Sequence, residues 1–380
     1  MTSFEKQLVT ASARSIHTAF AHPDTWSSYG VQWNSGEQKT LQCCAVRDET
    51  HDVKTFIFRS SDFSALSFEP GQFITVSPLI SGQSVSRCYT VSSSPTRPFA
   101  LSITVKRVPG GTVSNWLHDN LHEGDKLLAS GPAGSFTPVG RPATKLLYLS
   151  AGSGVTPLMS MTRAGFDMSA RLDIVFAHSA RTPIDIIFHD ELTRMQTCMP
   201  GLRVINICEG RGVDTDWSGP IGRLDLSLLS ELVPDFMELE VFTCGPQGYM
   251  DAVKSLLKQG KFDFQHYHQE SFDIAVLNEE PLLEQPSALD LQQGSFTVTL
   301  SRSGKTFSMS GNQTILSAAK KAGAIVPSSC SQGVCGTCKA ALLQGTVEMN
   351  HNGGIRQREI DKGLRLLCCS KPTSDLVIEL

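Results

Sequence analysis

Three cysteines lie within nine residues, at positions 330, 335 and 338 of the stretch "PSSCSQGVCGTC". Thiolates this close together could hold a zinc ion, hold an iron–sulfur cluster or form a disulfide. The chain has eleven cysteines, an odd number, and its first twenty residues lack the apolar core of a secretory signal. A disulfide framework is therefore not expected, because such frameworks are typical of short secreted chains.

The spacing of the cysteines favours an iron–sulfur cluster over zinc. Structural zinc sites usually take two cysteine pairs, whereas here C-x4-C-x2-C is followed only by the doublet Cys368–Cys369. One triplet with a distant fourth ligand is the plant-type [2Fe–2S] arrangement. Gly333 and Gly336 would let the loop wrap around the cluster. On spacing alone, either Cys368 or Cys369 could be the fourth ligand.

Two glycine-containing stretches predict a dinucleotide site. "SAGSGVTPLM" (150–159) follows an apolar run, so Gly152 and Gly154 would let a dinucleotide approach the N-terminus of the next helix. "TCGPQGYM" (243–250) ends a later apolar run, and open α/β sheets bind ligands at such strand ends. Taken alone, the glycine pattern is weak and Cys244 is most simply a buried core residue.

Hydrophobic patterning divides the 380 residues into parts that could position these groups. Residues 39–142 contain short β-type runs such as "GQFITVSPL" and "ALSITVKRV", separated by Pro, Gly and Ser, which predict an antiparallel β-barrel. Residues 143–276 alternate apolar runs such as "KLLYLSAG", "LDIVFAHS" and "LEVFTCG" with helical patterns. This alternation predicts an α/β doubly wound parallel sheet.

The remaining segments have simpler signals. Residues 277–293 carry two prolines and four acids, the composition of a linker. Residues 294–380 open with a hairpin-like pair and a helix candidate, "TILSAAKKAG", before the cysteine loop. Residues 1–38 show little periodicity and are expected to be an N-terminal extension without an assigned role, although their start also fits a weak organelle transit sequence.

Overall charge and hydropathy exclude some classes of partner. The net charge of −4 indicates no general affinity for nucleic acid. No run approaches eighteen apolar residues, so we expect no membrane span. A cytoplasmic protein is expected.

Residues 39–142 and 143–276, in this order, resemble the ferredoxin–NADP⁺ reductase superfamily. Residues 294–380 resemble a plant-type [2Fe–2S] ferredoxin of the α+β, β-grasp class, fused at the C-terminal end. "RCYT" (87–90) is similar to the flavin motif of that superfamily, Arg-x-Tyr-Ser/Thr. The resemblance implies that Arg87 pairs with the flavin phosphate, a role that suits a guanidinium. It further implies that Tyr89 packs along the isoalloxazine, that Thr90 hydrogen-bonds near its N5, and that Cys88 lies in the same site.

Other stretches match the superfamily's flavin and nicotinamide segments. "TVK" (Thr104, Val105 and Lys106) and "GTVSN" resemble flavin stretches, and the second implies FAD, with Gly111 and Ser114 offering backbone N–H groups to its pyrophosphate. Thr90 and Cys244 would set the approach of the nicotinamide, and Phe272 of "HQESF" would shield the flavin. The remaining residues implied to bind cofactors are Thr112, Val113, Gly152, Gly154, Thr156, Pro157, Arg181, Gly245 and Pro246.

The resemblance also selects the fourth cluster ligand. "GLRLLCCSKP" is similar to the end of plant-type ferredoxins, in which a glycine precedes the ligand and a proline follows four places later. Gly363, Cys368 and Pro372 match this pattern. The resemblance therefore implies that Cys330, Cys335, Cys338 and Cys368 hold the cluster, with Cys369 an ordinary neighbour.

The layout resembles reductase components of Rieske-type oxygenases and reductases of hybrid-cluster proteins. Among the former, the N-terminal extension and "DETHDVKTFIFR" (48–59) resemble the reductase components of glycine betaine-type monooxygenases. It implies transfer from NAD(P)H through FAD to the [2Fe–2S] cluster and then to a terminal oxygenase or another one-electron acceptor. A flavin is needed because a nicotinamide gives two electrons together while the cluster accepts one. The alternatives are a hybrid-cluster protein as the acceptor, a non-catalytic redox sensor and a zinc-binding module.

Two questions stay open at the level of sequence. No acid ends the strand candidate "LDIVFAHS", and Arg181 beyond it could meet a 2′-phosphate, stack on adenine or lie in solvent. The resemblance favours NADH. Residues 294–380 carry ten Lys and Arg against five Asp and Glu, which could dock on an acidic oxygenase or be an ordinary solvated surface.

Overall fold

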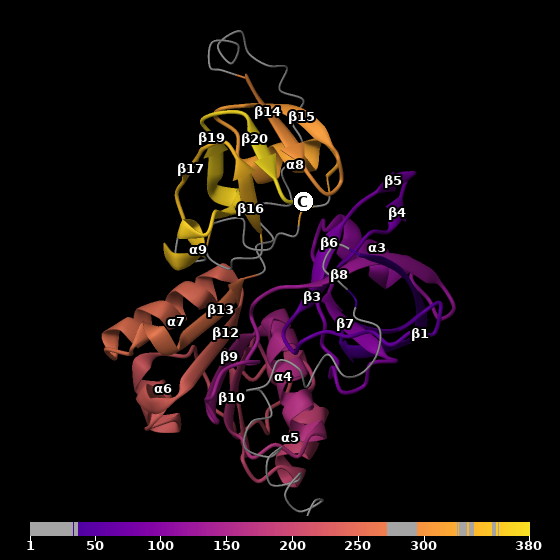
Figure 1. Ribbon diagram of the computed structural model, residues 1–380. Coiled ribbons are helices and arrows are strands. Elements are labelled where there is room, and N and C mark those ends of the chain that lie inside the picture. The colour runs from indigo at the N-terminus through magenta and orange to yellow at the C-terminus, as the bar shows by residue number, and fades with distance from the viewer. Residues whose placement is uncertain are drawn as a thin grey trace, which may run out of the picture. The chain divides into compact units, whose positions relative to one another are not determined.

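The computed structural model describes Trp33 and residues 37–271, 295–324, 326, 333, 338–351, 355 and 357–380 (Figure 1). These residues divide into two compact units. The first holds the described residues up to Ser271 except 133–135, and the second holds those three and the described residues from 295 onward. The five segments expected from the sequence, and their limits, stay predictions.

An antiparallel sheet of six strands forms the first part of the first unit, with the order β6-β3-β8-β1-β2-β7 (Figure 1). The pairs β1–β2, β1–β8, β2–β7 and β3–β6 are antiparallel. The sheet curls until Val91, directly after β6, bridges Ile103 of β7. The predicted antiparallel barrel is confirmed, with strands β1 (Gln38–Thr50), β2 (Val53–Ser60), β3 (Phe73–Val76), β6 (Arg87–Thr90), β7 (Leu101–Lys106) and β8 (Lys126–Ala133).

Alternation along the strands fills the inside of this barrel. Phe56 and Phe58 of β2 are fully buried, and they pack in one cluster with Leu101 and Ile103 of β7. Residues two apart on a strand share one face, so β-branched and aromatic residues at alternate positions collect on the inner side. A short hairpin, β4 (Leu79–Ile80) with β5 (Gln83–Ser84), and helix α3 (Thr112–Asn120) complete this part.

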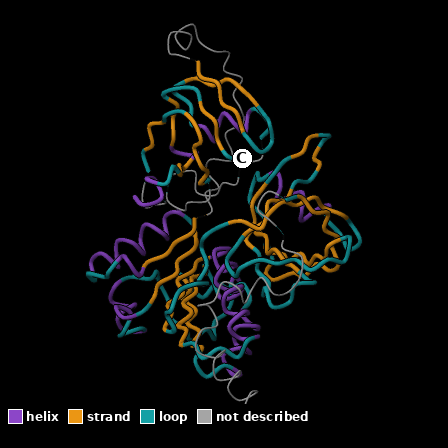
Figure 2. Tube along the Cα trace, in the orientation of Figure 1, coloured by secondary structure: helices purple, strands orange, loops and turns teal. Residues whose placement is uncertain are grey.

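A parallel sheet of five strands forms the second part of this unit, with the order β11-β10-β9-β12-β13. Every neighbouring pair is parallel, as predicted. The helices that connect the strands are drawn with them in Figure 2. The elements are β9 (Lys145–Ala151), α4 (Val155–Asp167), β10 (Asp173–Ala180), α5 (His189–Cys198), β11 (Leu202–Cys208), α6 (Leu226–Leu232), β12 (Glu240–Gly245), α7 (Gln247–Gln259) and β13 (Tyr267–Ser271).

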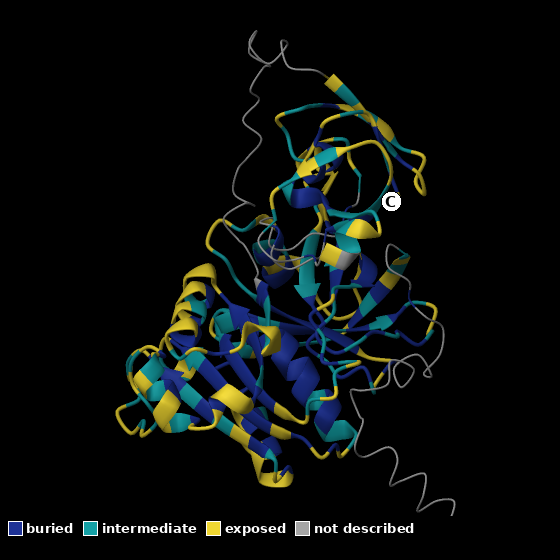
Figure 3. Cartoon of the chain, turned by 60° about the vertical axis from the view of Figure 1, so that its left-hand side comes forward, coloured by how far each residue is buried: buried dark blue, intermediate teal, exposed yellow. Residues whose placement is uncertain are grey.

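The strand order of this sheet reverses between β9 and β12. From β9 the chain first builds outward through β10 and β11, and then returns to add β12 and β13 on the other side. Such a reversal is the topological switch point, where open α/β sheets bind their ligands beyond the carboxyl ends of the strands. The three inner strands, β10, β9 and β12, are buried along nearly their whole length (Figure 3), because helices cover a parallel sheet on both faces.

The second unit contains a mixed five-stranded sheet, with the order β15-β14-β20-β16-β18. Its central pair β14–β20 is parallel, and the other pairs are antiparallel. Helix α8 (Ile315–Lys321) begins at Thr314, whose hydroxyl accepts the Ser317 N–H, and buries Ile315, Leu316, Ala318 and Ala319. The predicted α+β class is confirmed. The strands are β14 (Ser295–Leu300), β15 (Thr306–Ser310), β16 (Lys339–Gln344), β18 (Leu364–Leu366) and β20 (Leu376–Ile378).

A second, two-stranded sheet of this unit joins β17 (Val347–Met349) to β19 (Ser370–Pro372), and α9 (Gln357–Asp361) precedes β18. Across the described ranges of the chain, no helix combines the length and apolar character that crossing a bilayer requires.

Candidate functional site

Strand β6 carries the four residues of the "RCYT" motif. Arg87 is half-buried, and its Nη1 donates a hydrogen bond to the Ser86 carbonyl at 3.0 Å. Within the described part of the chain no carboxylate pairs with Arg87, and burial lowers the pKa of its guanidinium. Because an anion would compensate this loss of hydration, the residue fits a cofactor phosphate. The Cys88 Sγ lies 3.4 Å from the Thr75 hydroxyl on β3.

Thr90 and Tyr89 fit the edge of a flat cofactor. Thr90 is 3 % exposed, and its hydroxyl has no hydrogen-bond partner among the described residues. A buried polar group left unpaired costs about 1–3 kcal/mol, so such a hydroxyl fits a site completed by a cofactor atom. Tyr89 is half-buried against the barrel core, and burial raises the pKa of its phenol, which therefore stays neutral.

The side chains of the "TVK" motif are all engaged within the protein. The hydroxyl of Thr104 lies 2.8 Å from that of Thr55 and 2.9 Å from that of Ser92. Val105 belongs to the barrel core, and Lys106 pairs with Asp52 at 3.1 Å. A cofactor beside this strand would therefore meet its backbone rather than these side-chain groups.

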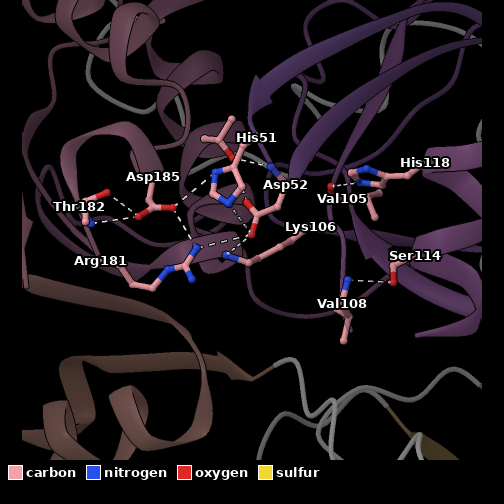
Figure 4. Close-up of polar contacts among 11 residues, drawn as sticks. His51, Asp52, Val105, Lys106, Val108, Ser114, His118, Arg181, Thr182 and Asp185 are labelled. Atoms are coloured by element: carbon pink, nitrogen blue, oxygen red, sulfur yellow. Dashed lines mark hydrogen bonds and ion pairs between the residues drawn. The ribbon is translucent and has the colours of Figure 1, made fainter. Parts of the chain in front are cut away.

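Helix α3 places its N-terminus just beyond β7. Its N-cap, Gly111, makes no side-chain cap, and the Asn115 N–H donates to the Gly111 carbonyl at 3.2 Å. The amides of Thr112, Val113 and Ser114 thus fall in the first turn, where helices leave N–H groups for an anion. Two bonds hold the loop in place (Figure 4): the Ser114 hydroxyl accepts from Val108 N at 3.2 Å, and the buried His118 Nε2 lies 2.8 Å from the Val105 carbonyl.

The glycine turn after β9 is a short 3₁₀ helix, η1 (Gly152–Gly154). Gly152 has φ of +51°, and a Cβ there would face open space. A Cβ on Gly154 would lie 2.2 Å from the Cys244 carbonyl oxygen, so only glycine permits this approach to β12. Thr156 donates its hydroxyl hydrogen to the Ser153 carbonyl at 3.1 Å, and Pro157 lies buried in the first turn of α4, where its missing N–H costs nothing.

The end of β12 brings a buried thiol to the switch point. Burial raises the pKa of Cys244 well above its ordinary value, and the charge of Glu270 raises it further. The thiol therefore stays protonated at neutral pH, which suits contact with a nicotinamide ring rather than nucleophilic attack. Gly245 is buried beside it, and Pro246 is the N-cap of α7.

Glu270 is a candidate that sequence reasoning missed. It is 1 % exposed and pairs in register with Cys244 across β12 and β13. The only signal in the sequence was its place in "HQESF" beside Phe272. Phe272 itself lies outside the described residues.

The structure brings three of the predicted stretches together. The glycine turn η1 lies beside β7 of the barrel on one side and beside β12 on another. Helix α4, which follows this turn, binds the segment directly after the "RCYT" motif. The Ser160 hydroxyl donates to the Ser93 carbonyl at 2.7 Å, and Arg163 Nη1 donates to the Ser92 carbonyl at 2.5 Å. The flavin motif is thereby fixed against the helix that begins at the dinucleotide turn.

Arg163 also contacts Glu191 and Phe188 of the nicotinamide-binding part. Its Nε and Nη2 donate to the two carboxylate oxygens of Glu191 at 2.8 and 2.6 Å, and its guanidinium lies 4.7 Å from the Phe188 ring centroid. Burial acts to raise the pKa of Glu191, but the hydrogen bonds and charge of Arg163 outweigh it, so the pKa lies below its ordinary value. A bidentate pair of this kind fixes the position of the guanidinium.

Arg181 is the first residue after β10. Its Nη2 lies 2.9 Å from a carboxylate oxygen of Asp185 and 3.6 Å from one of Asp52 (Figure 4). The absence of an acid at the end of the strand, noted from the sequence, is thus offset by two acids from elsewhere in the chain.

Two of the four predicted cluster ligands, Cys338 and Cys368, are among the described residues. Cys338 and Cys368 are 4 % and 6 % exposed within the core of the second unit, and the Cys368 N–H donates to Cys338 Sγ at 3.4 Å. Backbone hydrogen bonds to sulfur are typical of iron–sulfur sites. Cys369 instead directs its Sγ to the Leu366 carbonyl at 3.6 Å. Cys330 and Cys335 lie outside the described residues.

The loop that carries the predicted ligands is described only at Gly333 and at its end. Gly333 is buried with φ of +72°, the conformation expected of a wrapping loop. Among the residues that are described, no group of three or more His, Cys, Asp or Glu could hold a metal ion.

Comparison with family models divides the chain into three matches. Residues 41–137 match an oxidoreductase FAD-binding domain, residues 148–255 an oxidoreductase NAD-binding domain, and residues 298–373 a 2Fe-2S iron–sulfur cluster binding domain.

Some known proteins are similar to this one over nearly the whole chain. The glycine betaine monooxygenase reductase subunit of Pseudomonas aeruginosa is 45 % identical over 91 % of this chain and 96 % of its own. The stachydrine N-demethylase reductase subunit of Rhizobium meliloti is 39 % identical over 91 % and 97 %. Among solved structures, phthalate dioxygenase reductase superposes with a TM-score of 0.55 and 27 % identity over 90 % and 98 % of the two chains.

The fold and its motifs thus define an NAD(P)H-dependent oxidoreductase of the ferredoxin–NADP⁺ reductase superfamily that uses FAD and a [2Fe–2S] cluster. Within that class, the chain belongs to the family of the glycine betaine monooxygenase reductase subunits. The predicted family, fold class and cofactors are confirmed, whereas the roles of the individual site residues stay predictions.

Proposed function

We propose that this protein takes a hydride from NADH and passes single electrons to a Rieske-type terminal oxygenase that demethylates glycine betaine or a similar N-methylated ammonium carboxylate. The substrate class is inferred from the two relatives, whose names refer to glycine betaine and stachydrine. Both compounds carry a quaternary nitrogen and a carboxylate. The substrate would be selected by the oxygenase, and this chain would supply the electrons.

One observation carries the proposal: the flavin motif, the dinucleotide turn and Cys244 lie around one place. The glycine turn η1 contacts both β7 and β12, and α4 hydrogen-bonds to the backbone that follows Thr90. Hydride transfer between two bound rings depends chiefly on holding them in a reactive geometry. A fixed helix between the two binding segments supports that role.

The predicted site residues would each have a separate role in binding FAD or the nicotinamide. Bound FAD would accept the hydride and release electrons singly to the cluster. Arg87 and the first turn of α3 would hold the FAD phosphates, Tyr89 would pack along the ring, and Thr90 would hydrogen-bond near its N5. The nicotinamide would lie over Gly152 and Gly154 and against Cys244, with Phe272 as the shielding aromatic.

The cluster ligands would be Cys330, Cys335, Cys338 and Cys368. The Cys368 N–H that donates to Cys338 Sγ, and the different orientation of Cys369, support this choice. We further propose a cytoplasmic location, because the nine described cysteines form no disulfide with one another, as expected in a reducing compartment. The functional domains would be 39–142 for FAD, 143–276 for NAD(P)H and 294–380 for the cluster, with a linker at 277–293.

Reconstitution with a partner tests this function. The protein is mixed with NADH and the terminal oxygenase of a glycine betaine system, and formaldehyde release is measured with glycine betaine or stachydrine. We expect NADH-dependent demethylation that Cys368→Ser abolishes while NADH oxidation by ferricyanide persists. Rapid ferricyanide reduction with no reduction of the oxygenase would refute the proposed partner.

A further inference from the structure

Arg181 lies where a dinucleotide's adenine-side ribose is recognised. It follows β10, the strand adjacent to β9, and β9 leads into the glycine turn. In doubly wound sheets the residue at this strand end meets the ribose, and an arginine there accommodates the 2′-phosphate of NADPH. By residue type alone, Arg181 would therefore favour NADPH.

Two carboxylates already hold this arginine (Figure 4). Asp185 Oδ1 lies 2.9 Å from Arg181 Nη2, and Asp52 Oδ2 lies 3.6 Å from the same nitrogen. Asp185 is fixed in turn by Thr182, whose backbone N–H and hydroxyl donate to Asp185 Oδ2 at 3.1 and 2.7 Å. Asp52 comes from the turn between β1 and β2, in the flavin-binding part of the unit.

Asp52 is also fixed by partners of its own. Lys106 Nζ lies 3.1 Å from Asp52 Oδ2, and the Thr50 hydroxyl donates to Asp52 Oδ1 at 3.0 Å. Burial acts to raise the pKa of Asp52, but Lys106 and Thr50 outweigh it and lower the pKa, so the carboxylate is charged at neutral pH. The side chains of Asp52 and Asp185 are 20 % and 11 % exposed, against 59 % for Arg181. The acids are the held members of the group, and the arginine is the accessible one.

This arrangement affects the two dinucleotides differently. A phosphate bound to Arg181 would come within a few ångströms of two fixed negative charges, and like charges at that distance repel. A neutral 2′-hydroxyl would meet no such repulsion, and it could still donate to either carboxylate. We infer that Asp52, a residue of the flavin-binding part, selects NADH against NADPH by holding Arg181 and opposing a 2′-phosphate. The inference rests on the proposed use of a nicotinamide dinucleotide.

Binding of two small nucleotides tests the inference without catalysis. Calorimetry on the full-length holoprotein compares 5′-AMP with 2′,5′-ADP, which differs only by the 2′-phosphate. We expect Asp52→Asn to shift the ratio of the two affinities toward 2′,5′-ADP by about five- to tenfold. Asp48→Asn is the matched control, because Asp48 lies on the same hairpin and pairs with Lys54 at 3.8 Å. It should leave the ratio unchanged.

The ratio separates a charge effect from a structural one. A general disturbance of the turn would weaken both nucleotides together and leave their ratio as it was, which would overturn the inference. An equal shift in Asp48→Asn would also overturn it, since the effect would then be one of net charge. A wild-type protein that binds 2′,5′-ADP more tightly than 5′-AMP would contradict it directly.

A double variant tests whether Asp52 acts through Arg181. In an Arg181→Gln background, we expect Asp52→Asn to change the ratio of kcat/KM for NADPH and NADH much less than it does alone, because part of its effect is release of the arginine. Ferricyanide serves as the acceptor. Full additivity would show that Asp52 does not act through Arg181. If the protein oxidises neither dinucleotide, the proposed function fails, whereas the calorimetric ratio still decides the role of Asp52.

Discussion

Two of the contacts between the flavin-binding and nicotinamide-binding parts are opposite in character. At the first, Ser160 and Arg163 of α4 donate to the Ser93 and Ser92 carbonyls, and the side chain of Arg163 is 16 % exposed. At the second, Asp52 of the β1–β2 turn faces Arg181, which is 59 % exposed. The first contact binds backbone and is largely buried, while the second joins charged side chains and includes an exposed arginine.

The difference indicates a division of labour. Backbone carbonyls have fixed positions, so buried hydrogen bonds to them can hold two segments at one distance. Exposed ion pairs contribute little stability, with a median of about 0–1 kcal/mol, but they set the local charge. The α4 contact would therefore fix the flavin against the nicotinamide, and the Asp52 contact would choose between dinucleotides.

The largest effect should come from breaking the α4 contact at Arg163. Arg163→Met removes the bond to Ser92 and leaves Glu191 without its bidentate partner. We expect a loss of about 2–4 kcal/mol in the free energy of unfolding, and slower reduction of the flavin by NADH. Arg171→Met, at an exposed arginine of the same part, is the control for thermal unfolding and stopped-flow reduction. Similar small losses in both variants would refute the proposed role of this contact.

Acid should weaken the sheet on which both contacts depend. His178 of β10 is fully buried, its Nδ1 lies 2.8 Å from the Ser150 hydroxyl on β9, and burial lowers its pKa to about 4. The unfolded chain binds a proton near pH 6.5 and the folded chain only near pH 4. The neutral His178 therefore makes its full contribution to the free energy of unfolding above pH 6.5. This contribution, about 3 kcal/mol in total, is lost as the pH falls toward 4.

Denaturant unfolding at several pH values measures this loss. His178→Gln should flatten the decline between pH 6.5 and 4, whereas His122→Gln, at an exposed site, should leave it unchanged. A wild-type stability that does not fall across this window would show that His178 is not held neutral.

A milder change at the α4 contact should have a proportionally smaller effect. Ser160→Ala removes one hydrogen bond to the Ser93 carbonyl and should cost about 1 kcal/mol of stability. The control is Ser230→Ala, because the Ser230 hydroxyl donates to Leu226 within α6 and touches neither contact. A rate of flavin reduction that changes equally in both variants would contradict the positioning role of Ser160.

Salt should produce the smallest effect, and only at the second contact. Raising sodium chloride from about 0.05 to 0.5 M shortens the screening length, so the discrimination between NADH and NADPH should fall by about twofold. The free energy of unfolding attributable to Ser160 and Arg163 should hardly change. Discrimination that is independent of salt would indicate that shape rather than charge selects the dinucleotide.

The two contacts also differ in how far the sequence could predict them. The glycine turn, Thr90 and Cys244 were found because each belongs to a local motif, and the alternation of apolar runs gave the parallel sheet. Arg163, Asp52 and Glu270 were not found, because their partners are distant in sequence and meet them only through the pairing of strands and the packing of α4. Nothing in the residue type of Arg181 indicated that an acid from the barrel holds it.

The cluster ligands were likewise only partly predictable from the sequence. The spacing of Cys330, Cys335 and Cys338 was sufficient to suggest iron–sulfur chemistry, but it could not separate Cys368 from Cys369. The Cys368 N–H donates to Cys338 Sγ while the Cys369 thiol lies near the Leu366 carbonyl, and these contacts support Cys368 as the proposed ligand. Such contacts depend on the fold around each residue, which spacing alone does not specify.

Anaerobic titration with NADH, followed by absorbance, tests the central claim most directly, that electrons pass from NADH through FAD to a cluster held by Cys368. The account predicts that about 1.5 equivalents bleach both the flavin and the iron–sulfur bands of the wild type and of Cys369→Ser, because FAD takes two electrons and the cluster one. Cys368→Ser should bleach only at the flavin. Flavin bleaching without a cluster band in the wild type, or loss of the cluster in Cys369→Ser instead, would contradict the account.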